Sequence, residues 1–126
     1  MGTALSNETP TVLVAGKDGF YNRNFNGAYF YLLQNIFSVK HQFLLKYDWY
    51  DPNTKIKGKE IGAIGSNFTM ADVTFSTLGI GYIYYITSNV KAVLYYAMPT
   101  NEKTNLQGAT TNIADNIFTC RLQFRF

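Results

Sequence analysis

The last nine residues of the chain alternate strictly between apolar and polar side chains. Because successive side chains of a β-strand point to opposite faces, residues 118–126 are predicted to form a strand with one apolar wall. The other wall carries the guanidinium groups of Arg121 and Arg125. A helix would scatter these side chains around its circumference, so the pattern favours a strand. The apolar positions are Phe118, Cys120, Leu122, Phe124 and Phe126.

Two segments upstream have the same alternation. Residues 42–50 alternate except at Leu44, and Lys46 and Asp48 lie opposite the apolar side. Residues 91–98 follow with Lys91 on their polar side. The apolar walls of these two strands consist of Phe43, Leu45, Tyr47 and Trp49, and of Ala92, Leu94, Tyr96 and Met98.

Two other segments favour strands with less regular patterns. Residues 27–34 are rich in β-forming side chains, but their pattern does not separate two faces. Residues 71–86 predict a long strand whose apolar positions change parity near Ser76, which suggests a β-bulge. Its apolar wall consists of Leu78, Ile80, Tyr82, Tyr84 and Ile86.

The connections between these strands are of two kinds. Short turns are expected near residues 36–40 and 87–89, and long polar loops at 16–25, 52–70 and 99–114. Short turns alternating with long loops predict an all-β antiparallel meander, laid out like part of a transmembrane β-barrel. Strands near ten residues match the ~9–11 residues that cross a bilayer at a tilt.

The whole chain is interpreted as one segment with a loop-rich start. Residues 1–25 contain many Gly, Asn, Thr and Asp residues and one short β-forming run at 11–15. Residues 26–126 hold the predicted strands and loops, about five to six strands in all. The first six residues have neither the basic nor the apolar region of a secretory signal.

Composition favours a wall that faces lipid on one side. Among 126 residues, aromatics reach 17 % and charged residues only 15 %, against about 25 % in ordinary soluble proteins. No apolar run approaches the ~18 residues of a membrane-spanning helix.

The net charge of +3 is too small and dispersed to indicate a nucleic-acid partner. The single Cys120 occupies an apolar position, where a small hydrophobic role is expected.

No catalytic, metal or cofactor constellation emerges from the sequence, so no enzymatic activity is predicted. The single histidine, His41, lies at a predicted turn without a second ligand or a nucleophile at useful spacing, and is expected at the surface. The lysines of the 52–70 loop, Lys55, Lys57 and Lys59, are interpreted as a solvated charge run.

Three segments resemble the C-terminal part of the phosphate-selective porin O and P family, especially its Bacteroidetes members. These segments are His41-Gln42-Phe43-Leu44-Leu45-Lys46-Tyr47-Asp48-Trp49-Tyr50-Asp51-Pro52-Asn53, Thr77-Leu78-Gly79-Ile80-Gly81-Tyr82-Ile83-Tyr84-Tyr85 and Asn116-Ile117-Phe118-Thr119-Cys120-Arg121-Leu122-Gln123-Phe124-Arg125-Phe126. The final strand, with its terminal aromatic residue, also resembles the closing strand of outer-membrane barrels. The lysine cluster that binds phosphate in some family members has no match here, so phosphate selectivity is not carried over.

The resemblance implies a porin in the outer membrane of a Gram-negative bacterium. Its partners would be outer-membrane lipid and the barrel-assembly machinery, which reads the C-terminal strand, and the full-length form would be a homotrimer. Five or so strands cannot close such a barrel, and lipid does not tolerate an open sheet edge. The chain is therefore expected to be the last third of a porin; assembly of one barrel from several copies is the alternative.

Strand parity then assigns residues to two environments. The predicted pore-lining residues are Lys46, Asp48, Lys91, Arg121 and Arg125, because charge on a lipid face costs about 2–4 kcal/mol. The predicted lipid-facing or girdle residues are Phe43, Tyr47, Trp49, Tyr82, Tyr84, Phe118, Phe124 and Phe126.

Two questions stay open at this level. The pore cations either give the passive channel a preference for anionic, phosphate-like solutes, or they pair with carboxylates such as Asp48 and set no selectivity. The aromatic residues either face lipid or pack a closed interior. In the second case the chain would be a small soluble, lipocalin-like barrel that binds an apolar ligand.

Overall fold

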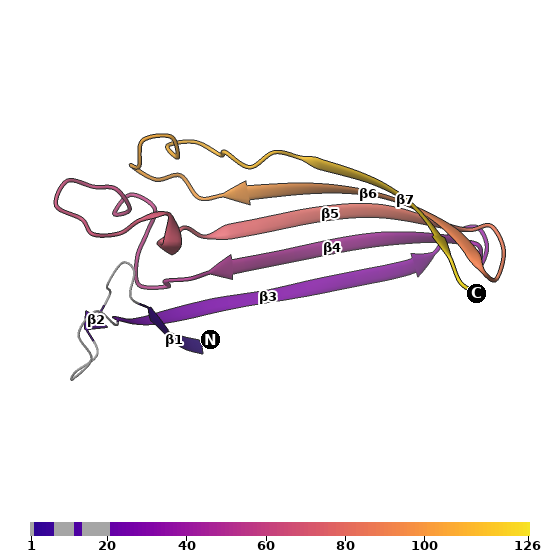
Figure 1. Cartoon of the computed structure of the whole chain (residues 1–126), viewed down its shortest axis with the longest axis horizontal. Coiled ribbons are helices and arrows are strands. Elements are labelled where there is room, and N and C mark those ends of the chain that lie inside the picture. Colours follow the sequence, from indigo (N-terminus) through magenta and orange to yellow (C-terminus); the bar gives the residue numbers. More distant parts are fainter. Residues whose placement is uncertain (1, 7–11, 14–20) are drawn as a thin grey trace. The chain divides into compact units, whose positions relative to one another are not determined.

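The strands form an antiparallel meander whose order in the sheet follows the sequence. The computed structural model describes residues 2–6, 12–13 and 21–126. Neighbouring strands in the sheet follow the order β1-β3-β4-β5-β6-β7, and β2 pairs with β3 (Figure 1). The elements are β1 (Gly2–Ser6), β2 (Val12–Leu13), β3 (Tyr21–Asn35), β4 (His41–Asp51), the 3-10 helix η1 (Met70–Asp72), β5 (Phe75–Tyr85), β6 (Val90–Asn101) and β7 (Ile117–Phe124).

The predicted all-β antiparallel meander is confirmed, and the sheet is open. Strands β3 to β7 form a five-stranded meander that does not close into a barrel. Within the described residues, β7 pairs only with β6, and β1 and β2 pair only with the start of β3, at residues 21–25. The outer edge of β7 therefore has unpaired backbone groups.

The start of the chain contains more strand than the sequence pattern predicted. The loop expected at 16–25 is wrong from Tyr21 onward, because β3 already begins there. Its residues 16–20 lie outside the described residues. Strand β1 was not expected, whereas β2 falls inside the predicted short run at 11–15, of which only Val12 and Leu13 are described. Both short strands pair with β3, and alternation within a single segment does not predict such a pairing.

The chain divides into two compact units. The loop unit comprises Met1–Ala28, Trp49–Ser76 and Thr100–Ala114, and the turn unit comprises Tyr29–Asp48, Thr77–Pro99 and Asp115–Phe126. The short turns, at residues 36–40 and 86–89, both belong to the turn unit. The two long loops after β4 and β6 belong almost entirely to the loop unit. The predicted alternation of short turns with long loops is therefore present after β3 to β6.

The long polar loops are folded around a small core of their own. Ile56, Ile61 and Val73 are buried together, and Phe68 and Leu106 pack against them. The predicted strand at 71–86 begins only at Phe75, because Val73 is drawn into this core as the residue that ends η1. The parity change near Ser76 thus marks a loop-to-strand boundary.

A buried polar network stabilises the same loops. The Asp72 carboxylate is fully buried and lies 3.4 Å from the Arg23 guanidinium. It also accepts hydrogen bonds from the side chain of Asn53 (2.8 Å) and from the backbone N–H of Thr69 (3.2 Å). A buried charge is tolerated when it is paired and hydrogen-bonded in this way.

A second carboxylate connects the two long loops. Glu102, at the start of the loop after β6, accepts hydrogen bonds from the backbone N–H groups of Gly58 and Thr74, each at 3.0 Å. Its own N–H donates to the Thr74 carbonyl at 3.0 Å. Further along, the Asn105 N–H donates to the Ile61 carbonyl at 2.9 Å. The loops therefore form one ordered body, although their composition predicted only polar connections.

Removing the buried carboxylate should unfold the loop unit locally. The Asp72→Ala variant leaves Arg23 and Asn53 without a shared partner, at an expected cost of about 3 kcal/mol. Amide hydrogen exchange at Val73 and Ile61 would measure the loss. The exposed Asp115→Ala is the matched control and should change exchange little. Equal protection in both variants would contradict a stabilising role for the network.

Candidate functional site

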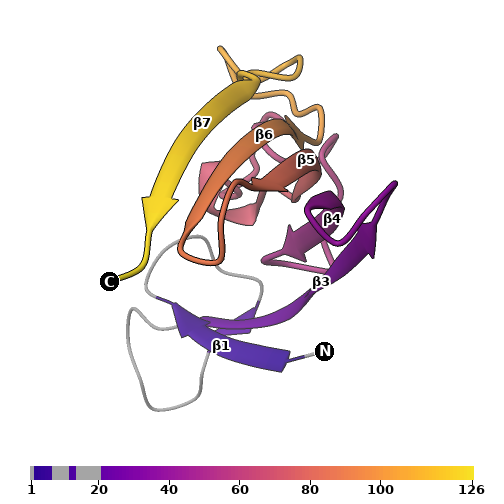
Figure 2. The ribbon, with the colours of Figure 1, turned by 90° about the vertical axis from the view of Figure 1, so that its right-hand side faces the viewer.

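The sheet of the turn unit has one face formed by apolar positions and an opposite face that carries the charged side chains, called here the apolar and the polar face. Register places Leu94 beside Cys120 and Tyr96 beside Phe118, so the apolar positions of β6 and β7 share a face. These two strands run side by side in both views of the ribbon (Figures 1 and 2). Large side chains on this face are between 40 % and 66 % exposed: Leu78, Ile80, Leu94, Tyr96, Phe118, Leu122 and Phe124. Patches of this kind mark surfaces that contact something other than water.

Two shallow hollows on the apolar face share Tyr82 and Leu94. One is also lined by Phe43, Ile80, Tyr96 and Phe118, and the other by His41, Tyr84 and Ala92. Gly81 and Tyr95, whose positions in β5 and β6 alternate to the opposite face, border the first hollow as well. The imidazole Nδ1 of His41 is hydrogen-bonded to the Tyr82 hydroxyl, and its ring centroid lies 4.9 Å from that of Tyr84. His41 lies at the start of β4 and is half-buried, so it is less exposed than the surface position expected from the sequence.

On the polar face, Lys46 and Asp48 neutralise each other. Their side chains form an ion pair of 2.5 Å, and the Lys46 ammonium also lies 5.8 Å from the centroid of the Tyr31 ring. This contact places Tyr31 on the polar face. The ring of Tyr29 lies beside it in an edge-to-face contact, with 5.8 Å between the two ring centroids. The two faces of β3, which its sequence did not separate, are thereby distinguished. The sequence left open whether the predicted pore cations stay free for solutes or pair with carboxylates. Lys46 is paired with the carboxylate of Asp48.

The other three predicted pore-lining cations have no such partner. Lys91, Arg121 and Arg125 form no ion pair with any described residue. Lys91 and Arg121 belong to polar positions of β6 and β7, and Arg125 follows directly after β7. Acidic residues are scarce in the turn unit, where only Asp48 and Asp115 occur. The polar face therefore has an excess of positive charge.

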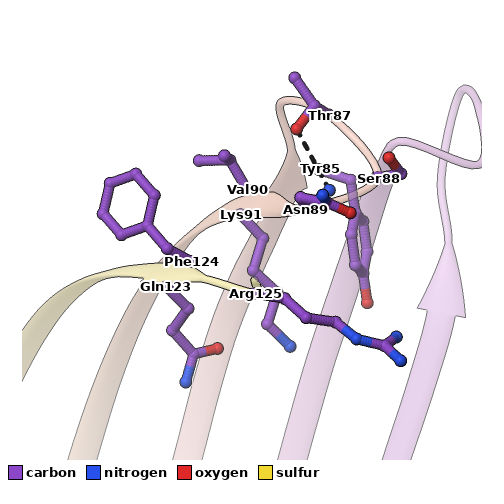
Figure 3. Close-up of a pocket in the computed structure, with 9 residues that line it drawn as sticks. All are labelled: Tyr85, Thr87, Ser88, Asn89, Val90, Lys91, Gln123, Phe124 and Arg125. Carbon is purple, nitrogen blue, oxygen red and sulfur yellow. Dashed lines mark hydrogen bonds between the residues drawn. The ribbon is translucent and has the colours of Figure 1, made fainter.

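Two of these cations line a hollow of about 350 Å³ beside the β5–β6 turn (Figure 3). Lys91 pairs in register with Gln123, and both side chains extend to the same side of the sheet. Arg125 extends to that side as well, whereas Val90 and Phe124 extend to the other. The residues lining the hollow are Tyr85, Thr87, Ser88, Asn89, Val90, Lys91, Gln123, Phe124 and Arg125.

A tyrosine packs over two glycines on the polar face. A Cβ at Gly79 would collide with the Tyr95 hydroxyl, and one at Gly81 would lie 3.2 Å from the Tyr95 ring. The absence of side chains at these positions lets the Tyr95 ring approach β5 closely. In the sequence, the Gly79-Ile80-Gly81 spacing indicated that a side chain could pack closely against this strand, but it did not identify Tyr95 of β6 as that side chain.

The predicted girdle residues lie in several environments. Tyr47, Phe118, Phe124 and Phe126 are exposed, and Phe43, Tyr82 and Tyr84 are half-buried among neighbours on the apolar face. Trp49 is half-buried in the loop unit. Their contact with lipid stays a prediction. Lys55, Lys57 and Lys59 are exposed in the loop after β4, as a solvated charge run would be.

No protein-family model, curated protein or solved structure significantly matches this chain. In the described part of the chain, no helix is long and apolar enough to span a membrane. The described residues also contain no group of three or more His, Cys, Asp or Glu side chains that could hold a metal ion. Function must therefore be argued from the two faces of the sheet.

The contact between Tyr95 and Gly79 can be tested by a double-mutant cycle. Gly79→Ala should cost about 1–3 kcal/mol, because the new methyl group displaces the phenol. In a Tyr95→Ala background the same change should cost less than about 0.5 kcal/mol, since the obstructing ring is gone. Urea unfolding in detergent micelles gives both values. Equal costs in the two backgrounds would show that Tyr95 does not occupy this space.

Proposed function

We propose that this chain is part of the wall of an outer-membrane porin in a Gram-negative bacterium. The porin is a passive channel for small hydrophilic solutes, including anionic ones. One observation carries the proposal: the sheet of the turn unit exposes a continuous apolar face and carries its charged groups on the opposite face. A soluble protein would cover such a face, whereas a barrel wall leaves it for lipid.

The location of the buried residues supports this assignment. The largest fully buried side chains, Ile61, Val73, Asn53 and Asp72, all lie in the loop unit. In the turn unit, Ile83 and Ala97 are the described hydrophobic residues that are buried. Transfer of the exposed leucine and aromatic side chains from water into hydrocarbon would contribute the free energy that a packed core supplies in soluble domains.

The open edge of the sheet supports the view that more strands complete the wall. The outer edge of β7 has no partner in the described residues, and unpaired backbone groups are costly in hydrocarbon. Further strands of a longer chain would satisfy them; pairing between several copies is the alternative arrangement. The barrel-assembly machinery would recognise β7, and the complete porin would be a homotrimer, as the family resemblance implies.

The excess of cations on the polar face supports a preference for anions. Fixed positive charge in a water-filled pore raises the local concentration of anions. Lys46 contributes little because Asp48 neutralises it, whereas Lys91, Arg121 and Arg125 keep their charge available. The rival function, soluble binding of an apolar ligand, needs an enclosed aromatic cavity. The hollows around Tyr82 instead open onto an exposed face.

A charge placed on either face of β7 tests the lipid-facing assignment. Leu122→Arg should weaken partition of the chain into phospholipid vesicles by about 2–4 kcal/mol if the residue faces the bilayer midplane. Thr119→Arg puts the same charge on the opposite face of the same strand and should change partition little. Flotation with vesicles measures both. Equal losses in the two variants, or a wild-type chain that stays folded and monomeric without detergent, would overturn the proposal.

The charge assignment predicts a selectivity difference in a channel that contains this chain. Arg121→Gln should shift the reversal potential in a salt gradient toward lower anion preference, because it removes an unpaired cation. The double change Lys46→Gln and Asp48→Asn should leave the potential unchanged, since it removes a neutral pair. A shift from the double change without one from Arg121→Gln would reverse the assignment.

A further inference from the structure

Four side chains from three neighbouring strands and the residue after β7 line the hollow beside the β5–β6 turn. Tyr85 belongs to β5, Lys91 to β6 and Gln123 to β7, and Arg125 follows β7 by one residue (Figure 3). All four side chains extend to the polar side of the sheet. The hollow thus combines two cations, an amide and a phenol, and its lining contains no carboxylate.

Backbone contacts hold these groups in place. The N–H of Arg125 donates to the Asn89 carbonyl at 2.8 Å, which fixes the end of β7 against the turn. The turn itself is closed by the N–H groups of Ile86 and Thr87, which both donate to the Val90 carbonyl. The Asn89 N–H also donates to the Thr87 hydroxyl at 3.2 Å (Figure 3). The site is therefore built on a defined turn and on paired strands.

The Lys91 ammonium is oriented without being neutralised. It lies 5.8 Å from the centroid of the Tyr85 ring, and register with Gln123 places the amide beside it. The Tyr85 hydroxyl donates a hydrogen bond to the side-chain amide oxygen Oε1 of Gln42 at 3.3 Å, which holds the ring. A cation over an aromatic ring keeps its full charge and its hydrogen-bond donors. Lys91 and Arg125 are thus both available to an anion.

We propose that this hollow binds a small oxyanion, the carboxylate or phosphate group of a dissolved solute. The planar guanidinium of Arg125 can donate two parallel hydrogen bonds to such a group, and Lys91 and the Gln123 amide supply further donors. A volume of about 350 Å³ accommodates a small solute rather than a polymer. The inference deepens the proposed porin function and rests on it, because the channel would bring solutes to this face.

Titration of the full chain in detergent micelles tests the site directly. Sodium phosphate, acetate and succinate would be added in separate arms at constant ionic strength, with sodium chloride as the reference salt. Amide resonances of Ser88, Asn89 and Arg125 should shift and saturate with the oxyanions, and not with chloride. The arms show which oxyanion binds best, and saturation by any of them supports the proposal.

Variants that remove one charge each distinguish binding at this hollow from a general attraction of anions by the positive potential of the polar face. Arg125→Gln and Lys91→Gln should each weaken binding roughly tenfold, because each removes a charged hydrogen-bond donor. Arg121→Gln removes an equal charge from the same face of β7, outside the hollow, and should change affinity less than about twofold. Arg125→Lys keeps the charge and should recover part of the affinity. Unchanged resonances elsewhere would verify that each variant is folded.

Other results would overturn the site. An equal loss in Arg121→Gln and Arg125→Gln would show that only the general positive field acts, and non-saturating shifts would show that no site exists. The vesicle experiment with Leu122→Arg is independent of this one. A chain that partitions into vesicles without saturable oxyanion binding would refute the site alone, whereas saturable binding by a chain that stays out of vesicles would refute the channel alone.

Discussion

The uncovered apolar face of the turn unit is the constraint on which the rest of this structure depends. Backbone groups between paired strands of the meander are hydrogen-bonded to each other, but no layer of described residues covers side chains such as Leu94, Phe118 and Leu122. Such a sheet is stable only if an apolar medium or another surface covers it. Hydrocarbon is the medium that matches a face without charged groups, and this match motivates the porin proposal.

The loop unit obtains its stability by different means. Its core is small, and much of its order comes from buried polar contacts around Asp72 and from the backbone hydrogen bonds that Glu102 accepts. These contacts connect segments far apart in sequence, such as Arg23 and Asp72.

Pairing of charges determines which polar residues can act on a solute. Lys46 and Asp48 are two residues apart on one strand, and because alternate side chains share a face, they meet and neutralise each other. Lys91 and Arg125 come from different segments and remain unpaired beside the β5–β6 turn. Among the described residues, the unpaired positive charge of the polar face therefore belongs to Lys91 and Arg125 beside this turn and to Arg121, whereas the charge of Lys46 is neutralised.

Alternation along single strands was sufficient to predict the meander and to separate the apolar from the polar positions of β4, β6 and β7, because these follow from the twofold period of a strand. The sequence also indicated which connections are short. It did not reveal the strand β1, the core around Ile61, the position of Tyr95 over Gly79, or the convergence of Lys91 with Arg125. Each of these depends on which segments become neighbours across strands or loops. The sequence therefore predicts which side chains of one strand share a face, whereas contacts between distant segments were decided only by the tertiary structure.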